Sequence, residues 1–205
     1  IELVVENRTP EDAAQIVQRI CGVCPVSHAH ASSIAAEKAY GITISNNARI
    51  IRNILEGAQF LHSHILWFYN LAGLDYVNPL NALKANPADA MDLARAAGTS
   101  MNSDFVALKE HLSQFAENGQ LSIFSGNWFD AEDGTGFKLP PELDLICTAH
   151  YLEALGMQAK ASQISALLGG KMPHVMTLRP GGTAFVPTDQ KLDDLKLLVD
   201  ELYNW

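Results

Sequence analysis

Two cysteines separated by two residues form the part of this sequence that packing alone explains least. Cys21 and Cys24 flank Gly22, and Arg19 adds a positive charge just before them. A glycine here permits backbone angles that other residues resist, so both sulfurs can be directed at one metal ion. Pro25 suits the first turn of a helix, where free N–H groups and the helix dipole favour thiolate over thiol. The segment therefore predicts chemistry at the two sulfurs.

His28 adds a candidate hydrogen-bond donor to this segment. It lies four residues beyond Cys24, one helical turn along the same face, and can donate toward the sulfur. On spacing alone, three interpretations are open: a metal site, a thiol–disulfide site and a pair of structural cysteines. A thioredoxin-like site expects a preceding strand, whereas a capped helix is predicted here. Four-cysteine ligation would need a second pair, and Cys147 has no cysteine near it in the sequence.

The composition narrows the class of protein. With 205 residues, 48% of them apolar, the chain can bury one sizeable core, and one domain is the default. A net charge of −9, without clusters of Lys and Arg, opposes binding to nucleic acid or anionic membranes. Three cysteines do not make the disulfide framework of a small secreted domain. No apolar run is long enough for a membrane span, and no secretory leader opens the printed sequence.

Both ends of the printed sequence look cut. Residues 1–5 lie inside an apolar, strand-like run without a methionine, and 198–205 stop within a helical pattern with no Gly or Asn cap after it. We therefore expect residues 1–205 to be a single internal segment of a larger domain, truncated at both ends.

Helices dominate the predicted elements. Thr9 and Pro10 cap and open a short helix that leads into the cysteines, and the alanines at 29, 31, 35, 36 and 39 give the next helix a small-residue face for close packing. The fold class is mainly α, a bundle of long helices with small β elements and a long irregular loop. The predicted helices span 9–21, 25–41, 45–73, 86–111, 140–170 and the stretch after Thr188, with the loop at 118–138 and a small hairpin at 174–185.

The remaining histidine pair and cysteine are expected to be structural. His62 and His64 are two apart on the predicted long helix and cannot share one face, so core or interface histidines are expected rather than a metal site. Cys147 lies in an apolar helix, where a buried thiol is expected rather than a ligand.

The residues around the cysteines resemble a known signature. The run R-I-C-G-V-C-P-V-S-H at 19–28 is similar to R-x-C-G-x-C-x-x-x-H of NiFe hydrogenase large subunits. Upstream, N-R-T-P-E-D-A at 7–13 resembles the family's G-R-D-P-R-D-A stretch. Residues 47–53 and 64–77 resemble the long helix of the respiratory, membrane-associated uptake branch, and G-G-K-M-P-H at 169–174 resembles its G-G-K-x-P-H motif. Four motifs in family order favour this family over the alternatives left open by spacing.

The resemblance implies a function and its cofactors. Cys21 would be a terminal nickel ligand and Cys24 would bridge nickel and iron, since soft thiolates suit both metals. The implied centre is Ni–Fe with CO and CN ligands on iron, and the implied reaction is reversible heterolytic cleavage of H2 into protons and electrons. A small subunit with Fe–S clusters would be the partner that takes the electrons. Arg19 and His28 belong to the same signature and are the other candidate catalytic residues.

Further residues are assigned by the resemblance alone. Glu2, nineteen residues before Cys21, stands where the family has a carboxylate on a structural Mg²⁺. His174 matches a histidine that faces the small subunit near its nearest cluster. Ser63 departs from the Asp of many members, which puts an acid–base role there in doubt. The family's second cysteine pair and its amino-terminal glutamate stretch are not among the printed residues, so this segment alone is expected to be inactive.

Two rival functions are weighed against this one. A thiol–disulfide oxidoreductase would use Cys21 and Cys24 for dithiol exchange. A non-catalytic relative, such as the quinone-site subunit of respiratory complex I, shares the ancestry without the metal, and the presence of both thiols opposes it. The uptake-branch resemblance favours a periplasmic or membrane-associated location through the partner, with a cytoplasmic location as the alternative.

Overall fold

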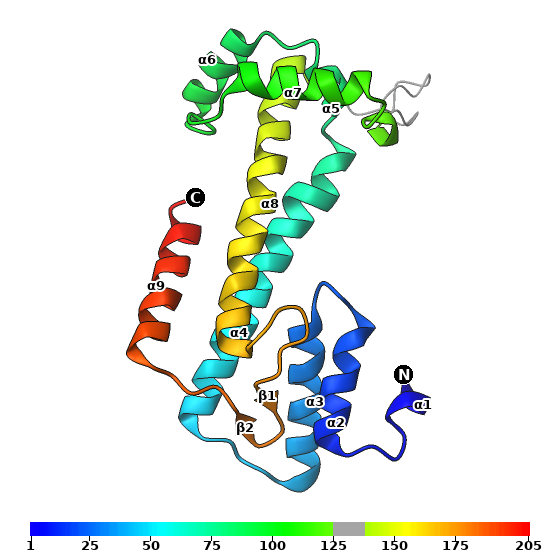
Figure 1. The fold of residues 1–205 in the computed structure, drawn as a ribbon, viewed down its shortest axis with the longest axis vertical. Helices are drawn as coiled ribbons and strands as arrows, with labels where there is room; N and C mark the ends of the chain where they lie inside the picture. The colour runs from blue at the N-terminus through cyan, green and yellow to red at the C-terminus, as the bar shows by residue number, and fades with distance from the viewer. Residues whose placement is uncertain (125–137) are drawn as a thin grey trace. The chain divides into compact units, whose positions relative to one another are not determined.

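Helices make up most of the chain in a computed structural model that describes residues 1–124 and 138–205 (Figure 1). The mainly α fold class is confirmed, and the strands in the described residues are two short ones. The chain divides into two compact units. The first unit comprises Ile1–Ile65 with Met157–Trp205, and the second comprises Leu66–Gly156. Within the described residues, no helix combines the length and apolar character needed to cross a membrane.

The first unit contains the cysteine segment. Its elements are the helices α1 (Glu2–Val5), α2 (Pro10–Ile16), α3 (Pro25–Tyr40), α4 (Asn46–Ile65) and α9 (Asp189–Tyr203), the 3₁₀ helix η1 (Val17–Ile20) and the strands β1 (Leu178–Arg179) and β2 (Gly182–Thr183). Helix α8 (Pro141–Gly169) contributes its last turns. Figure 1 shows the β1–β2 hairpin beside α3.

The helix starts in this unit follow the predicted caps. The Thr9 hydroxyl accepts from the Asp12 N–H at 3.2 Å, and Pro10 is the first residue of α2. The Ser45 hydroxyl accepts from Ala48 N–H at 3.2 Å, and the Thr188 hydroxyl accepts from Lys191 N–H at 3.4 Å. The predicted small hairpin is also confirmed, with Leu178 paired to Thr183 and Arg179 to Gly182.

Two sequence predictions for this unit are wrong. The strand-like run at 1–5 forms the helical turn α1, closed by Glu6 N–H to Glu2 C=O at 3.0 Å, because the described residues offer no neighbouring strand to pair with it. The predicted alanine face of α3 is not the buried one, since only Ala29 of those alanines is buried. The buried stripe of α3 is Val26, Ala29, Ser33 and Glu37, a spacing of three and four residues.

The second unit begins where the predicted long helix changes its winding. After α4 the chain continues as the π-helical turn η2 (Leu66–Leu71) and the 3₁₀ turn η3 (Ala72–Asp75). A Cβ at Gly73 would lie 3.0 Å from the carbonyl oxygen of Phe68, so glycine permits this close return of the backbone. The other elements are the helices α5 (Pro79–Ala82), α6 (Pro87–Ala97) and α7 (Phe105–Glu117), the 3₁₀ turn η4 (Ser122–Phe124) and the first part of α8.

The single helix predicted at 86–111 is wrong, because the structure has two helices there. Gly98 adopts φ +71°, a left-handed cap that ends α6, and the Asp104 carboxylate then accepts from Val106 and Ala107 N–H to start α7. The predicted helix at 140–170 is confirmed as α8, a helix of 29 residues. The irregular loop predicted at 118–138 lies mostly outside the described residues, from 125 to 137.

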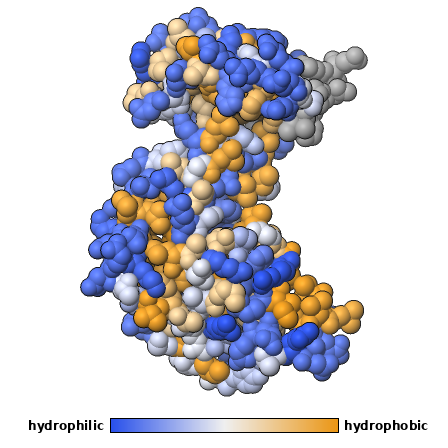
Figure 2. Space-filling model, in the orientation of Figure 1, coloured by the Kyte–Doolittle hydropathy of each residue, from blue (hydrophilic) through white to orange (hydrophobic). Residues whose placement is uncertain are grey.

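Each unit has its own apolar core. Val26, Leu55, Ile164, Leu168 and Leu178 are buried together in the first unit. Phe105, Leu112, Leu145 and Ile146 lead the core of the second unit. Apolar side chains also remain at the surface, as the orange areas of Figure 2 show, and Leu3, Trp67 and Tyr203 are each more than half exposed.

Candidate metal centre

The two cysteines lie on the connection between η1 and α3. Cys21 is extended and ends η1, while Cys24 directly precedes Pro25, the first residue of α3. All three cysteines of the chain are free, and the N–H of Cys24 points at the sulfur of Cys21 with 3.4 Å between nitrogen and sulfur. Gly22 is not in the left-handed region, and a Cβ there would meet no atom within 4 Å, so the steric role expected for this glycine is not seen.

The two thiols differ in their acidity. The pKa of Cys21 is lowered because its thiolate accepts hydrogen bonds from the Cys24 thiol and from the backbone N–H groups of Cys24 and Val23. The pKa of Cys24 is raised, first because its thiol donates to Cys21, then because of burial and the negative charge of Cys21, with Glu56 adding to this. The pair therefore loses its first proton at Cys21, and one thiolate is available for a soft metal.

Within the first unit, helix α4 carries a row of polar side chains along one face. Arg52, Glu56, Gln59 and Ser63 recur at intervals of three or four residues, so they lie along one helical face. Next to the cysteines, the Glu56 carboxylate accepts from the Ser27 hydroxyl at 2.5 Å and lies 3.4 Å from Nδ1 of His30. The apolar stripe of the same helix is the stronger pattern in the sequence and does not predict this row, although the spacing of the polar residues is visible there.

Gln59 reaches the cysteine segment directly. Its Nε2 donates to the carbonyl oxygen of Val23 at 2.7 Å and to the hydroxyl of Ser63 at 3.1 Å. An acid–base role for Ser63 is in doubt from the sequence. In the structure its hydroxyl accepts a hydrogen bond from Gln59. His62 is half-buried, and burial lowers its pKa, whereas the His64 ring stacks on Phe60 at 3.9 Å between ring centroids.

At one end of this row, a buried ion pair of Arg52 and Glu37 binds the β1–β2 hairpin. The Arg52 guanidinium, 1% exposed, donates to both carboxylate oxygens of Glu37 at 2.6 and 3.1 Å and to the carbonyl of Gly182. Gly181 N–H also donates to Glu37 at 2.8 Å. Burial alone would raise the pKa of Glu37, but the hydrogen bonds and charge of Arg52 with the Gly181 N–H lower it. The carboxylate therefore stays charged and holds α3, α4 and the hairpin together.

The loop that carries His174 returns to the cysteine segment. The side chain of Gln18 donates to the carbonyl of Val175 at 2.9 Å, and a Cβ at Gly169 would overlap with the Val175 side chain, which explains one glycine of the G-G-K motif. Burial lowers the pKa of His174, and the positive charges of Arg19 and Lys171 lower it further. Arg19, just before the cysteines, is therefore one of the charges that act on His174.

Two of the predicted site residues are not joined to the sulfurs. Within residues 1–124 and 138–205, no hydrogen bond links His28 to Cys21 or Cys24, and its helical neighbours Ser27 and His30 bond to Glu56 instead. Glu2 is exposed in the turn α1. The described residues also hold no cluster of three His, Cys, Asp or Glu side chains that could bind a metal ion.

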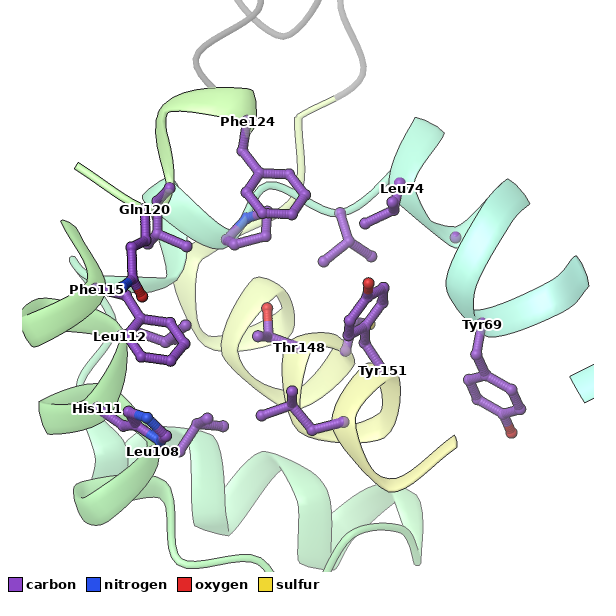
Figure 3. Close-up of a pocket in the computed structure, with 16 residues that line it drawn as sticks. Tyr69, Leu74, Leu108, His111, Leu112, Phe115, Gln120, Phe124, Thr148 and Tyr151 are labelled. Carbon is purple, nitrogen blue, oxygen red and sulfur yellow. The ribbon is translucent and has the colours of Figure 1, made fainter. Parts of the chain in front are cut away.

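A second concave site lies wholly within the second unit. Figure 3 shows Phe124, Thr148 and Tyr151 around a pocket of about 320 Å³ with mainly apolar walls. Cys147 lines this pocket, and burial together with the negative charge of Asp144 raises its pKa. Cys147 is half-buried rather than buried as expected, and a structural role for it remains a prediction.

The donor set at Cys21 and Cys24 fits the thiolate half of a nickel–iron centre. Soft sulfur ligands suit these metals, and the loop provides two neighbouring cysteines, one of them with a lowered pKa. Two thiolates leave such a centre under-coordinated, so further ligands would have to come from outside the described residues.

Comparison with known proteins gives the same family for the whole chain. The model of the family described as nickel-dependent hydrogenase matches residues 1–205. The Hydrogenase-2 large chain of Escherichia coli is 43% identical over 187 residues, which cover 90% of this chain and 32% of that protein. The uptake hydrogenase large subunit of Rhodobacter capsulatus is 42% identical over 178 residues, covering 85% and 29%.

Solved structures agree with the sequence relatives. The Ni-Fe-Se hydrogenase of Desulfovibrio vulgaris Hildenborough superposes with a TM-score of 0.69 at 30% identity, over 98% of this chain and 33% of that one. The enzyme of Desulfomicrobium baculatum gives a TM-score of 0.69 at 31% identity, covering 98% and 34%. The chain spans about a third of the length of these relatives. The chain belongs to the nickel-dependent hydrogenase family.

Proposed function

We propose that the protein containing this chain is the catalytic large subunit of a hydrogenase that reversibly cleaves H2 into protons and electrons. The observation that carries the proposal is the pair of free sulfurs on the η1–α3 connection, one of them with a lowered pKa, in a chain matched over its full length by the family model. Its relatives are named as hydrogenase large chains and uptake hydrogenase large subunits.

In this proposal the two cysteines have different tasks. Cys21 would be a ligand of nickel and Cys24 a ligand shared by nickel and iron, and CO and CN would be the other ligands of iron. When bound, a centre of this kind supplies heterolytic activation of H2. The terminal thiolate of Cys21 would be a base that can accept the proton from H2. Arg19, whose side chain donates to Gln15 C=O at 2.7 Å, contributes positive charge nearby.

The surroundings of the cysteines suggest further parts of the assembly. His174, whose pKa the positive charge of Arg19 helps to lower, is proposed to face a small subunit whose Fe–S clusters accept the electrons. Glu2 is proposed as a Mg²⁺ ligand and His28 as a neighbour of the metal centre. The respiratory uptake branch, and with it a periplasmic or membrane-associated location through the partner, rests on the resemblance of residues 47–53 and 64–77.

Metal analysis of the mature complex tests this function. The large subunit, purified with its small subunit after maturation, is expected to contain nickel and iron and to show infrared bands of CO and CN on iron. Cys21→Ser should remove nickel and H2 oxidation, whereas Cys147→Ser, at the third free cysteine, should leave both unchanged. An intact wild-type complex without nickel would contradict the proposal. Dithiol exchange that depends on Cys21 and Cys24 in such metal-free protein would favour a thiol–disulfide oxidoreductase.

A further inference from the structure

The buried amide of Gln59 is attached to the backbone between the two cysteines. Gln59 is 1% exposed on α4, and its Nε2 lies 2.7 Å from the carbonyl oxygen of Val23. That carbonyl can only accept, so the amide group facing it must be the NH2. The bond is partly buried and joins a helix to the irregular connection that carries both sulfurs.

The peptide group that Gln59 holds also contacts a sulfur. The carbonyl of Val23 and the N–H of Cys24 belong to one planar peptide unit, and in a trans peptide they point in opposite directions. Gln59 holds the oxygen, and the N–H lies 3.4 Å from the sulfur of Cys21. Fixing the oxygen therefore fixes the direction of the N–H and, through it, the approach of Cys21 to Cys24.

Stability alone gives little reason for an amide at this position. Oε1 of Gln59 is buried and has no hydrogen-bond partner among the residues that the structure describes. A buried acceptor without a partner costs about 1–3 kcal/mol. A methionine has nearly the same length and no such group, so packing would favour it. The specific bond to Val23 is what an apolar side chain cannot supply.

We propose that Gln59 is a positioning residue that orients the Val23–Cys24 peptide and so presents the sulfurs of Cys21 and Cys24 as a preformed pair for a soft metal ion. This inference rests on the proposed function, because it assigns Gln59 to the same metal centre. Groups that orient metal ligands without touching the metal change metal affinity by about ten- to a hundredfold when removed.

Cadmium binding by the reduced 205-residue chain tests the inference without measuring hydrogenase activity. Cd²⁺ is titrated alone, and its binding is followed by the ultraviolet sulfur-to-cadmium charge-transfer band. Gln59→Met should weaken Cd²⁺ binding about ten- to a hundredfold. Gln18→Met is the matched control, because Gln18 is also buried, also donates to a backbone carbonyl, that of Val175, and also has an unpartnered Oε1. Its Cd²⁺ affinity should stay close to that of the wild type.

The outcomes separate this inference from the proposed function. Gln59→Glu provides a second variant of nearly the same shape, whose carboxylate cannot donate to Val23, and should show the same loss. Circular dichroism shows whether each Gln59 variant is folded. If either folded variant binds Cd²⁺ as tightly as the wild type, the inference is overturned, while the proposed thiolate site is unaffected. An equal loss in Gln18→Met would also overturn it. A charge-transfer band that survives Cys21→Ser with Cys24→Ser would contradict the proposed site itself.

Discussion

The two units of this chain surround their sites differently, although each buries both apolar and polar groups, with Asp144 among the buried polar groups of the second. In the first, the polar row of α4 holds the neighbouring segments, with Arg52 bonded to Glu37 at one end and Gln59 bonded to Val23 and Ser63 towards the other. In the second, apolar side chains such as Phe105 and Leu145 fill the interior and leave an apolar pocket. Directional bonds fix where a loop lies, whereas apolar contacts mainly exclude water. The segment that carries the cysteines is thus held by directional bonds, whereas the pocket of the second unit is lined mainly by apolar side chains.

Removing Arg52 should have the largest effect on the first unit. Among the described residues, Arg52→Met leaves the Gly181 N–H as the hydrogen-bond donor to the buried Glu37 carboxylate, which should lower the free energy of unfolding by about 3–5 kcal/mol. Urea unfolding followed by circular dichroism measures this change. Adding Glu37→Leu to Arg52→Met should recover part of the loss, because no charge then stays buried. A double variant less stable than Arg52→Met would show that the charge is not the cause.

A core truncation in the second unit should cost a similar amount for another reason. Phe105→Ala removes a side chain that is 2% exposed, and the transfer and cavity terms together predict a loss of about 3–5 kcal/mol. This loss should not change between about pH 3 and pH 6, since no ionisable group is uncovered. Urea unfolding at several pH values tests this; a pH-dependent loss would weaken the contrast between the units.

The cost of Arg52→Met, by contrast, should depend on pH. In the wild type the pKa of Glu37 is lowered by folding, so its contribution is complete above the unfolded pKa of about 4.3 and is lost as pH falls through the lower folded value. In Arg52→Met burial raises this pKa, so the variant gains stability as the carboxyl is protonated. The difference in free energy of unfolding between the two proteins should therefore shrink from about pH 6 to about pH 3. A constant difference would show that Arg52 acts through packing alone.

The distance along the chain between a residue and its partner explains which features could be predicted from the sequence. Thr9, Pro10, Ser45 and Thr188 each act on residues within four positions, so the helix starts that they predict are found in the structure. The breaks at Gly98 and Asp104 were missed because apolar spacing continued across them, although both residues are familiar end signals. The cysteines were visible as a motif. Gln59 was not, because its partner Val23 is 36 residues away and only tertiary structure joins them.

Thiol reactivity should differ between the units by a smaller factor. Cys21 has a lowered pKa, while burial and Asp144 raise that of Cys147, so iodoacetamide at neutral pH should modify Cys21 first and Cys147 last. We expect Cys21 to react about tenfold faster than Cys147, a ratio that corresponds to about 1.4 kcal/mol. Mass spectrometry of the native, reduced chain at timed intervals gives the order. Faster labelling of Cys147 would mean that the pocket exposes its thiol more than its walls indicate.

Helix caps should give the smallest effects, and nearly the same effect in both units. Thr9→Ala removes one bond to Asp12 N–H in the first unit, and Asp104→Ala removes bonds to Val106 and Ala107 N–H in the second. Each should lower the free energy of unfolding by about 1 kcal/mol, with Asp104→Ala the larger because its charge also faces the positive end of the α7 dipole. Urea unfolding measures both. Similar small losses would confine the difference between the units to their interiors, whereas a loss at Thr9 as large as that of Arg52→Met would mean that the start of α2 also holds the cysteine segment in place.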